Sequence, residues 1–261
     1  MTAKITIRGL DHEFVNPFTR ERVVALEGVD LQVEEGEFLT VVGPSGCGKT
    51  TLLNILAGLL QKTRGTVLLD GREVAGPGPD RGVVFQEFAI MPWRTVEKNI
   101  AHGLEIQGVP KEERATIVRR FVELVGLRGF ERKYPHELSG GMKQRVAVAR
   151  TLAANPEVML MDEPFASVDS QTRITLQEEL NAIAQATRKT ILFVTHNVEE
   201  AVFLGDRCCV LSGRPGRVKA LVPVRIPRER RKWKIVMSDA TFDAAKEKVF
   251  GLVREEVGRE D

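Results

Sequence analysis

Cysteine, surplus charge and long apolar runs are all scarce in this chain of 261 residues. The three cysteines, Cys47, Cys208 and Cys209, are too few and too unevenly spaced for a disulfide framework or a zinc site, which favours a reducing compartment. Thirty-eight lysines and arginines nearly balance 36 aspartates and glutamates, so a net charge of +2 gives no broad field to attract nucleic acid. No apolar run approaches the roughly 18 to 20 residues that cross a bilayer. We therefore expect no nucleic-acid partner and no membrane span.

Short β-rich segments recur along the chain, and several are followed by helical patterns. Residues 38–42, 158–161 and 191–194 form almost continuous apolar runs, which are typical of parallel strands buried on both faces. Between about residues 88 and 156, apolar side chains recur at helical spacing instead. The sequence therefore predicts an α/β core with an inserted helical subdomain.

The chain divides into a main unit at residues 1–224 and a final segment at residues 225–261. This segment turns basic from Arg225 to Lys234, and apolar residues then return at helical spacing over residues 242–257. We interpret it as a solvated basic linker followed by a C-terminal helix. A patch for nucleic acid or a membrane surface is the alternative for the basic run.

A glycine-rich segment at residues 43–51 carries the strongest functional signal. It matches the pattern G-x-x-x-x-G-K-[ST] between an apolar strand and a helical run, and in this context the glycines let backbone N–H groups surround phosphate oxygens. We expect Lys49 to bridge the β- and γ-phosphates and Thr50 to offer a hydroxyl to Mg²⁺. The predicted nucleotide-binding residues here are Gly43, Pro44, Ser45, Gly46, Cys47, Gly48, Lys49, Thr50 and Thr51.

Two carboxylates, Asp162 and Glu163, follow the apolar run at residues 158–161. Open α/β sheets bind ligands at the carboxyl ends of their strands, so both side chains are candidates for a site there. One carboxylate can hold Mg²⁺ through its water shell while the other accepts a proton from an attacking water. We assign the metal to Asp162 and the general base to Glu163.

Two further polar residues come after apolar runs. His196 follows the run at residues 191–195, where it could donate a hydrogen bond to a γ-phosphate or to the attacking water. Gln86 follows the short run at residues 83–85, and its amide could coordinate Mg²⁺ and sense the nucleotide. We expect both to act in catalysis.

The segment Leu-Ser-Gly-Gly-Met-Lys-Gln-Arg at residues 138–145 resembles the signature of ABC-type ATPases. It opens a helical pattern between the phosphate loop and the acidic strand end, as in that family. Ser139 is a helix cap, and Gly140 and Gly141 leave first-turn N–H groups open to an anion. The resemblance covers about residues 5–222. It implies a RecA-like P-loop NTPase core with an antiparallel β portion, and hydrolysis of ATP with Mg²⁺.

The resemblance also implies that two cassettes pair head to tail, as a homodimer or with a similar subunit. Ser139 and Gly141 would then contact the γ-phosphate bound by the partner, and Asp169 would link the two sites. The segment at residues 166–169 departs mildly from the family's commoner Ser-Ala-Leu-Asp but keeps Asp169. The family also stacks an aromatic side chain on adenine. Phe14 is the best positional match, and Phe18 is the alternative.

A cassette with no span of its own resembles the ATPase subunit of a bacterial importer, which works with separate permease chains and a substrate-binding protein. Residues 91–100 are similar to the importer region that meets a permease, and this region together with residues 212–216 resembles the nitrate, sulfonate and taurine group. We expect a peripheral subunit on the cytoplasmic face of the inner (cell) membrane that powers import of a small anion. The alternatives are an ABC ATPase for a lipid or another solute, and a soluble ABC ATPase without a transport role.

Overall fold

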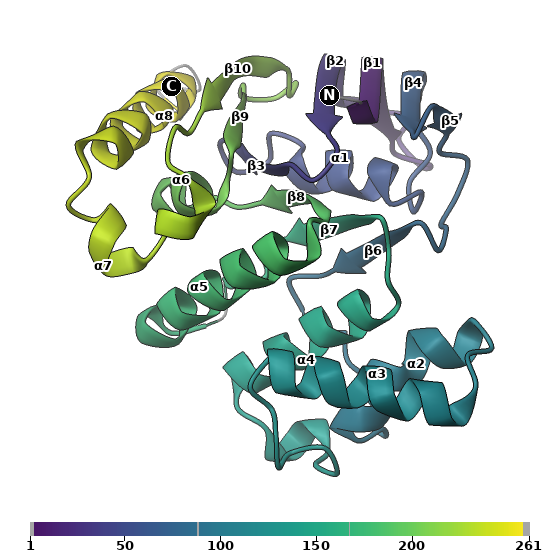
Figure 1. Cartoon of the computed structure of the whole chain (residues 1–261). Helices are drawn as coiled ribbons and strands as arrows, with labels where there is room; N and C mark the ends of the chain where they lie inside the picture. Colours follow the sequence, from purple (N-terminus) through teal and green to yellow (C-terminus); the bar gives the residue numbers. More distant parts are fainter. Residues whose placement is uncertain (1–2, 88, 167, 258–261) are drawn as a thin grey trace.

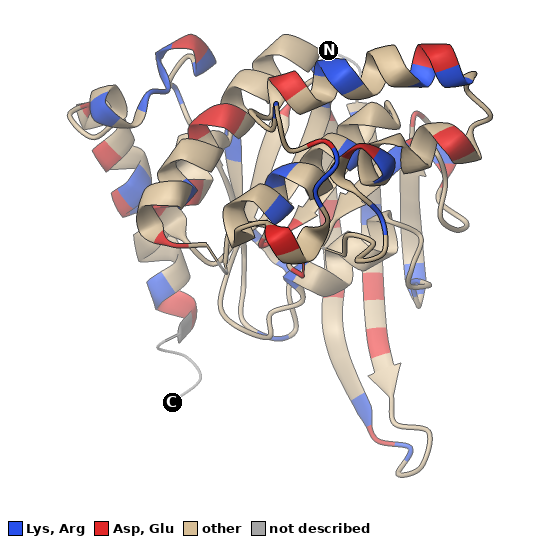
Figure 2. Cartoon of the chain, turned by 90° about the horizontal axis from the view of Figure 1, so that it is seen from below, with Lys and Arg blue, Asp and Glu red and all other residues tan. Residues whose placement is uncertain are grey.

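The computed structural model describes residues 3–87, 89–166 and 168–257. Two sheets and a group of helices make up this part of the chain, as Figure 1 shows. The sheets occupy the upper part of the view, and the helical group lies below them. In the view of Figure 2, acidic and basic residues are interspersed along the helices and strands, in keeping with the near-zero net charge.

The larger sheet has the order β10-β9-β3-β8-β7-β6. Neighbouring strands from β9 to β6 run parallel, and β10 is antiparallel to β9. Every residue of β3, β7 and β8 is buried, as the continuous apolar runs predict. The strands are β3 (Phe38–Val42), β6 (Arg81–Val84), β7 (Val158–Asp162), β8 (Thr190–Val194), β9 (Arg207–Leu211) and β10 (Val218–Pro223).

The smaller sheet is antiparallel and has the order β2-β1-β4-β5. Its long hairpin is closed by a turn in which the Asn16 side chain accepts hydrogen bonds from the N–H groups of Phe18 and Thr19. The strands are β1 (Ala3–Val15), β2 (Arg22–Glu34), β4 (Arg64–Leu69) and β5 (Arg72–Glu73).

Helices cover the parallel sheet and form the separate group below it. α5 (Ser170–Thr187) and α6 (Val198–Leu204) connect strands of the parallel sheet, and α1 (Lys49–Leu56) leads from β3 to β4 of the smaller sheet. The separate group lies within the span expected to be helical, whose first position, residue 88, is outside the described residues. Its elements are α2 (Val96–Ile106), α3 (Lys111–Leu124), the 3₁₀ turn η1 (Pro135–Glu137) and α4 (Gly140–Ala153).

The C-terminal segment contains the 3₁₀ turn η2 (Arg228–Arg230), the short α7 (Trp233–Val236) and the expected helix, α8 (Ala240–Val257). Two of the basic residues assigned to a solvated linker are fixed against the core, so that interpretation is wrong for them. Arg231 is 2% exposed, and its guanidinium donates to Leu204 O at 2.6 Å. The last carbonyl groups of a helix have no hydrogen-bond partner within the helix. The buried Arg231 supplies the missing donor to the carbonyl at the end of α6. Arg228 pairs with Asp206.

The three cysteines are free and buried. Burial raises the pKa of Cys208 to about 11 and that of Cys209 to about 12, so both thiols stay protonated at neutral pH. They are small apolar side chains of β9, as the sequence predicts. None of the helices in the described part of the chain is long and apolar enough to cross a membrane.

Candidate functional site

The phosphate loop links the buried end of β3 to the start of α1. Gly48 caps α1 with φ of 98°, and a Cβ there would lie 2.9 Å from the carbonyl oxygen of Ala25. Left-handed backbone and this close approach together require glycine. Lys49 is buried, and its Nζ donates to Gly43 O at 2.9 Å and Pro44 O at 2.7 Å. The loop is therefore closely packed, with its lysine held over its own backbone.

Asp162 is the last residue of β7 and accepts a hydrogen bond from Thr50 Oγ1 at 3.2 Å. Burial raises the pKa of the Asp162 carboxyl, while the Thr50 hydroxyl and the Lys49 ammonium act in the opposite direction. A hydroxyl beside a buried carboxylate is a ligand pair that fits Mg²⁺. Among the described residues no group of three His, Cys, Asp or Glu side chains could hold a metal.

Glu163 and His196 meet at the ends of two neighbouring strands. Glu163 Oε2 lies 2.8 Å from His196 Nδ1. The backbone of Glu163 has φ of 42°, a left-handed conformation that is unfavourable for a side chain of this size, and its N–H donates to Val194 O at 2.9 Å. Adjacent parallel strands place their carboxyl ends at one edge of the sheet. This is why Glu163 and His196, which were predicted separately, lie side by side.

Glu200, which the sequence analysis missed, supports the residue before His196. Its carboxylate accepts hydrogen bonds from the Thr195 hydroxyl and from Gln177 Nε2, the latter at 2.9 Å. Burial raises the pKa of Glu200 above its ordinary value. In the sequence, Glu200 is one of two acidic residues in the first turn of a helix. Acidic residues are common at exposed helix starts, so its position does not indicate a buried role.

A cavity of about 280 Å³ lies beside the phosphate loop. Of the two aromatic candidates, Phe14 lines it, edge to face with His12 at 4.6 Å, whereas Phe18 does not line it and is 91% exposed at the hairpin turn. Arg214 also lines the cavity and was missed from the sequence. The lining residues are Phe14, Val23, Ala25, Ser45, Gly46, Gly48, Lys49, Thr50, Thr51, Glu163 and Arg214.

The signature residues lie elsewhere, at the start of α4 in the helical group (Figure 1). Ser139 caps the helix by accepting from Met142 N–H at 3.3 Å, and it is exposed together with Gly140. Gly141 is buried, and a Cβ there would lie 2.6 Å from Thr172 Cγ2 on α5. None of these three predicted residues lines the cavity beside the phosphate loop.

Asp169 and Gln86 also lie outside that cavity. Asp169 is exposed and caps α5 by accepting from Thr172 N–H at 3.0 Å, a bond that lowers the pKa of its carboxyl. Gln86 is exposed just after β6. The structure thus brings the phosphate loop, Asp162, Glu163 and His196 together, whereas Gln86, Asp169, Ser139 and Gly140 are exposed and line no part of that cavity.

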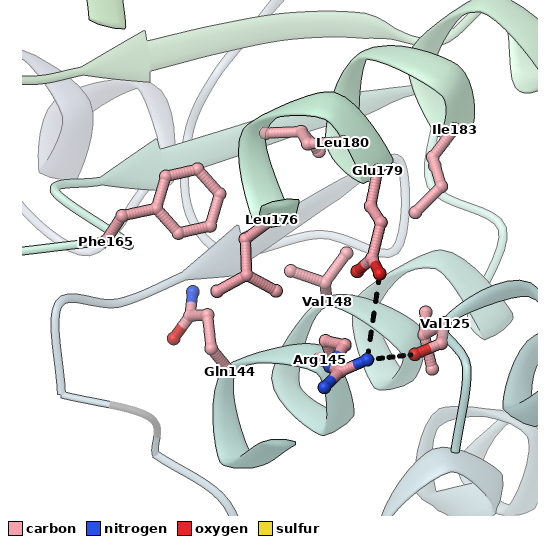
Figure 3. A pocket seen from close by; sticks show the side chains of 9 residues that line it. All are labelled: Val125, Gln144, Arg145, Val148, Phe165, Leu176, Glu179, Leu180 and Ile183. Carbon is pink, nitrogen blue, oxygen red and sulfur yellow. Dashed lines mark hydrogen bonds and ion pairs between the residues drawn. The ribbon is translucent and has the colours of Figure 1, made fainter. Parts of the chain in front are cut away.

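The signature helix, α4, meets α5 around a small pocket that is lined by apolar and polar side chains, as Figure 3 shows. Arg145 on α4 lies 3.7 Å from Glu179 on α5, across a cavity of about 10 Å³ that has room for one water. Gln144 is fully buried there, and its amide has no hydrogen-bond partner among the residues that the structure describes. Burial raises the pKa of Glu179. The contact between α4 and α5 therefore holds a buried amide and a half-buried ion pair among apolar side chains.

Residues 26–166 match a family model described as ABC transporter. The chain belongs to this family. It is 54% identical over 257 residues to an ABC transporter ATP-binding protein, MJ0412, of Methanocaldococcus jannaschii, and this covers 98% of our chain and 94% of that protein. The fold is also similar to a dimeric structure of the ATP-binding cassette MJ0796 bound to ADP and Pi. That match has a TM-score of 0.75 and 30% identity, and it covers 85% of our chain and 100% of the other.

Two further relatives carry transport names. The nitrate import ATP-binding protein NrtD of Synechocystis sp. is 48% identical over 85% of this ABC cassette and 83% of its own length. The taurine import ATP-binding protein TauB of Escherichia coli is 45% identical, over 89% and 92%. The comparisons confirm the predicted P-loop fold, and they establish the chain as an ATP-binding ABC ATPase.

Proposed function

We propose that this cassette hydrolyses ATP with Mg²⁺ in the cavity beside the phosphate loop and powers the import of a small anion through separate permease subunits. The observation that carries the proposal is the convergence of Lys49, the Thr50–Asp162 pair and the Glu163–His196 pair at one edge of the parallel sheet. Side chains from β7, β8 and the phosphate loop meet there, at the edge where open α/β sheets bind ligands.

Each residue takes the role that its position supports. Lys49 binds the β- and γ-phosphates, and Phe14 stacks on adenine at the β1 side of the cavity. Glu163 accepts the proton of the water that attacks the γ-phosphorus, and His196, 2.8 Å away, donates a hydrogen bond to the γ-phosphate or to that water. Thr50, Asp162 and Gln86 would hold Mg²⁺, which would neutralise charge at the phosphates.

A second cassette completes each site in this proposal. Ser139 and Gly140 are exposed at a helix N-terminus, which is suited to an anion but lies apart from the cavity of their own chain. Head-to-tail pairing brings Ser139, Gly140 and Gly141 over the partner's γ-phosphate and places Asp169 between the two sites. A homodimer satisfies this arrangement, and so does a pair with a similar subunit.

The permease contact is assigned to the segment around Trp93, which is 74% exposed. Asn99 is fully buried and fixes this segment, because its Oδ1 accepts from Met91 N–H at 2.8 Å and its Nδ2 donates to Met91 O at 3.1 Å. A large aromatic side chain held outward on a fixed turn is typical of a docking surface. This contact would hold the subunit on the cytoplasmic face of the membrane.

Support for the cargo comes from the relatives, two of which are named for nitrate and taurine import. Both names denote small solutes that carry an anionic group, so we assign this cassette to an importer of such an anion, with a separate substrate-binding protein.

Co-purification from native membranes tests the transport role. The intact chain should bring down integral membrane permease subunits, and Trp93→Glu should lose them while keeping ATP affinity. Phe18→Glu, a charge placed on another exposed aromatic side chain, at the hairpin turn, serves as the control and should keep the permease. Recovery of nucleic-acid proteins alone, with no permease, would contradict import and favour a soluble ABC ATPase.

A further inference from the structure

The loop between β9 and β10 reaches the cavity beside the phosphate loop. Gly216 N–H donates to Ala25 O at 2.9 Å, and Gly216 O accepts from Glu27 N–H at 3.0 Å, so the loop is tied to β2. A Cβ on Gly216 would overlap the carbonyl oxygen of Cys47, which means that the loop packs directly on the phosphate loop. The position of Arg214, two residues earlier, is thereby fixed relative to Gly48 and Lys49.

The same loop is held by its own hydroxyl and by the C-terminal helix. Ser212 Oγ accepts from Arg217 N–H at 3.0 Å and donates to Pro215 O at 3.0 Å. Glu256 on α8 accepts from Gly213 N–H at 3.0 Å. Because the loop is anchored at both ends, its backbone around Arg214 has little conformational freedom left to lose on binding.

Arg214 is an uncompensated cation at the wall of this cavity. It has no hydrogen bond or ion pair with any residue that the structure describes, whereas its neighbour Arg217 pairs with Glu27 at 2.7 Å. Lys49 is the other cationic residue among those that line the cavity, and its Nζ is held by backbone carbonyls. A nucleoside triphosphate carries several negative charges, and a single lysine cannot balance them all. The phosphates are therefore a suitable ligand for the Arg214 guanidinium beside the loop.

We propose that Arg214 is a nucleotide-binding residue whose guanidinium contacts the α- or β-phosphate. The assignment rests on the proposed function, in which this cavity holds ATP. Gly48 and Gly216 both lie against the carbonyl of Ala25, which places the loop beside the middle of the phosphate loop. Glu163 and His196 mark the γ-phosphate end, and Phe14 marks the adenine end. Arg214 therefore acts on ATP and ADP alike.

Calorimetric titration of the intact chain with ATP, ADP and adenosine tests this assignment. Arg214→Ala should raise the Kd for ATP and for ADP by roughly tenfold, as expected for one partly exposed charge-assisted hydrogen bond, and leave adenosine unchanged. The difference between the variant and the wild type should shrink as salt is added. Arg217→Ala removes an equal charge from the same loop outside the cavity and should bind all three ligands like the wild type.

Three results would overturn the assignment. ATP and ADP affinities that are unchanged in Arg214→Ala would remove Arg214 from the site. A loss confined to ATP would place it at the γ-phosphate, and an equal loss for adenosine would make it a contact of the base or of the fold. Lys49→Ala separates this inference from the proposed function, because a Lys49 variant that binds ATP like the wild type contradicts the nucleotide site itself, and with it the role of Arg214.

Discussion

The phosphate-loop end and the signature end of this cassette both offer backbone N–H groups to an anion, but they are built differently. At the phosphate-loop end, side chains from β1, β2, the phosphate loop, the end of β7 and the β9–β10 loop line one cavity of about 280 Å³. At the signature end, Ser139 and Gly140 face solvent and line no part of that cavity. In the proposed function, the phosphate-loop end is the binding half-site, and the signature end is the half-site that closes over the partner's nucleotide.

The signature end is connected to the core through the contact between α4 and α5. α4 carries the signature, and it meets α5 through Arg145, Glu179 and the buried amide of Gln144 (Figure 3). Asp169 caps the same α5. Apolar side chains such as Val148, Leu176 and Leu180 surround these polar groups, and a cavity with room for one water lies among them.

The largest expected effect comes from placing a charge at the signature. Ser139→Glu should lower ATP turnover by about a hundredfold, since a carboxylate there repels the phosphate that the helix N-terminus must stabilise. The ATP affinity of the isolated chain should not change, because Ser139 lies outside the cavity. Steady-state ATPase rates and calorimetric titration measure the two quantities separately.

Ser238→Glu is the matched control, an exposed serine given the same charge far along the chain in the turn before α8. It should keep both turnover and ATP affinity. If Ser139→Glu weakened ATP binding in the monomer as strongly as it slowed turnover, the two ends would form one site within a single chain.

A smaller effect is expected at the adenine side of the cavity. Phe14→Ala should weaken ATP binding by about tenfold, the loss typical of a base stacked on an aromatic side chain. Phe18→Ala should leave the Kd unchanged, because Phe18 lies at the hairpin turn outside the cavity. Titration with ATP checks both variants, and equal, negligible losses would remove the adenine site from β1.

Local motifs and strand topology explain why much of the site could be predicted from the sequence. The phosphate loop is contiguous, and Asp162, Glu163 and His196 follow buried apolar runs whose carboxyl ends must share an edge in a parallel sheet. The choice between Phe14 and Phe18 stayed open because it depends on where the hairpin turns. In the structure β1 ends at Val15, which leaves Phe14 on the strand and Phe18 in the turn.

Contacts between segments far apart in the chain could not be predicted. Arg214 lines the cavity only because Gly216, far along the chain, packs on Cys47 of the phosphate loop. Arg231 reads as part of a solvated basic run, yet it is buried because the end of α6 needs donors for its carbonyls. In both cases the contact is made with a backbone carbonyl group, of Cys47 or of Leu204. Every residue has such a group, so the sequence does not indicate which one is contacted.

The most direct test of the two half-sites is the oligomeric state of Glu163→Gln, measured by light scattering with and without ATP. Removing the general base should keep ATP bound but unhydrolysed. We therefore expect the variant to be a monomer without nucleotide and a dimer with ATP. Adding Ser139→Glu should return the protein to a monomer at unchanged ATP affinity. A Glu163→Gln chain that stays monomeric when saturated with ATP, or a dimer that persists with Ser139→Glu, would contradict the proposal that the signature end closes over the partner's nucleotide.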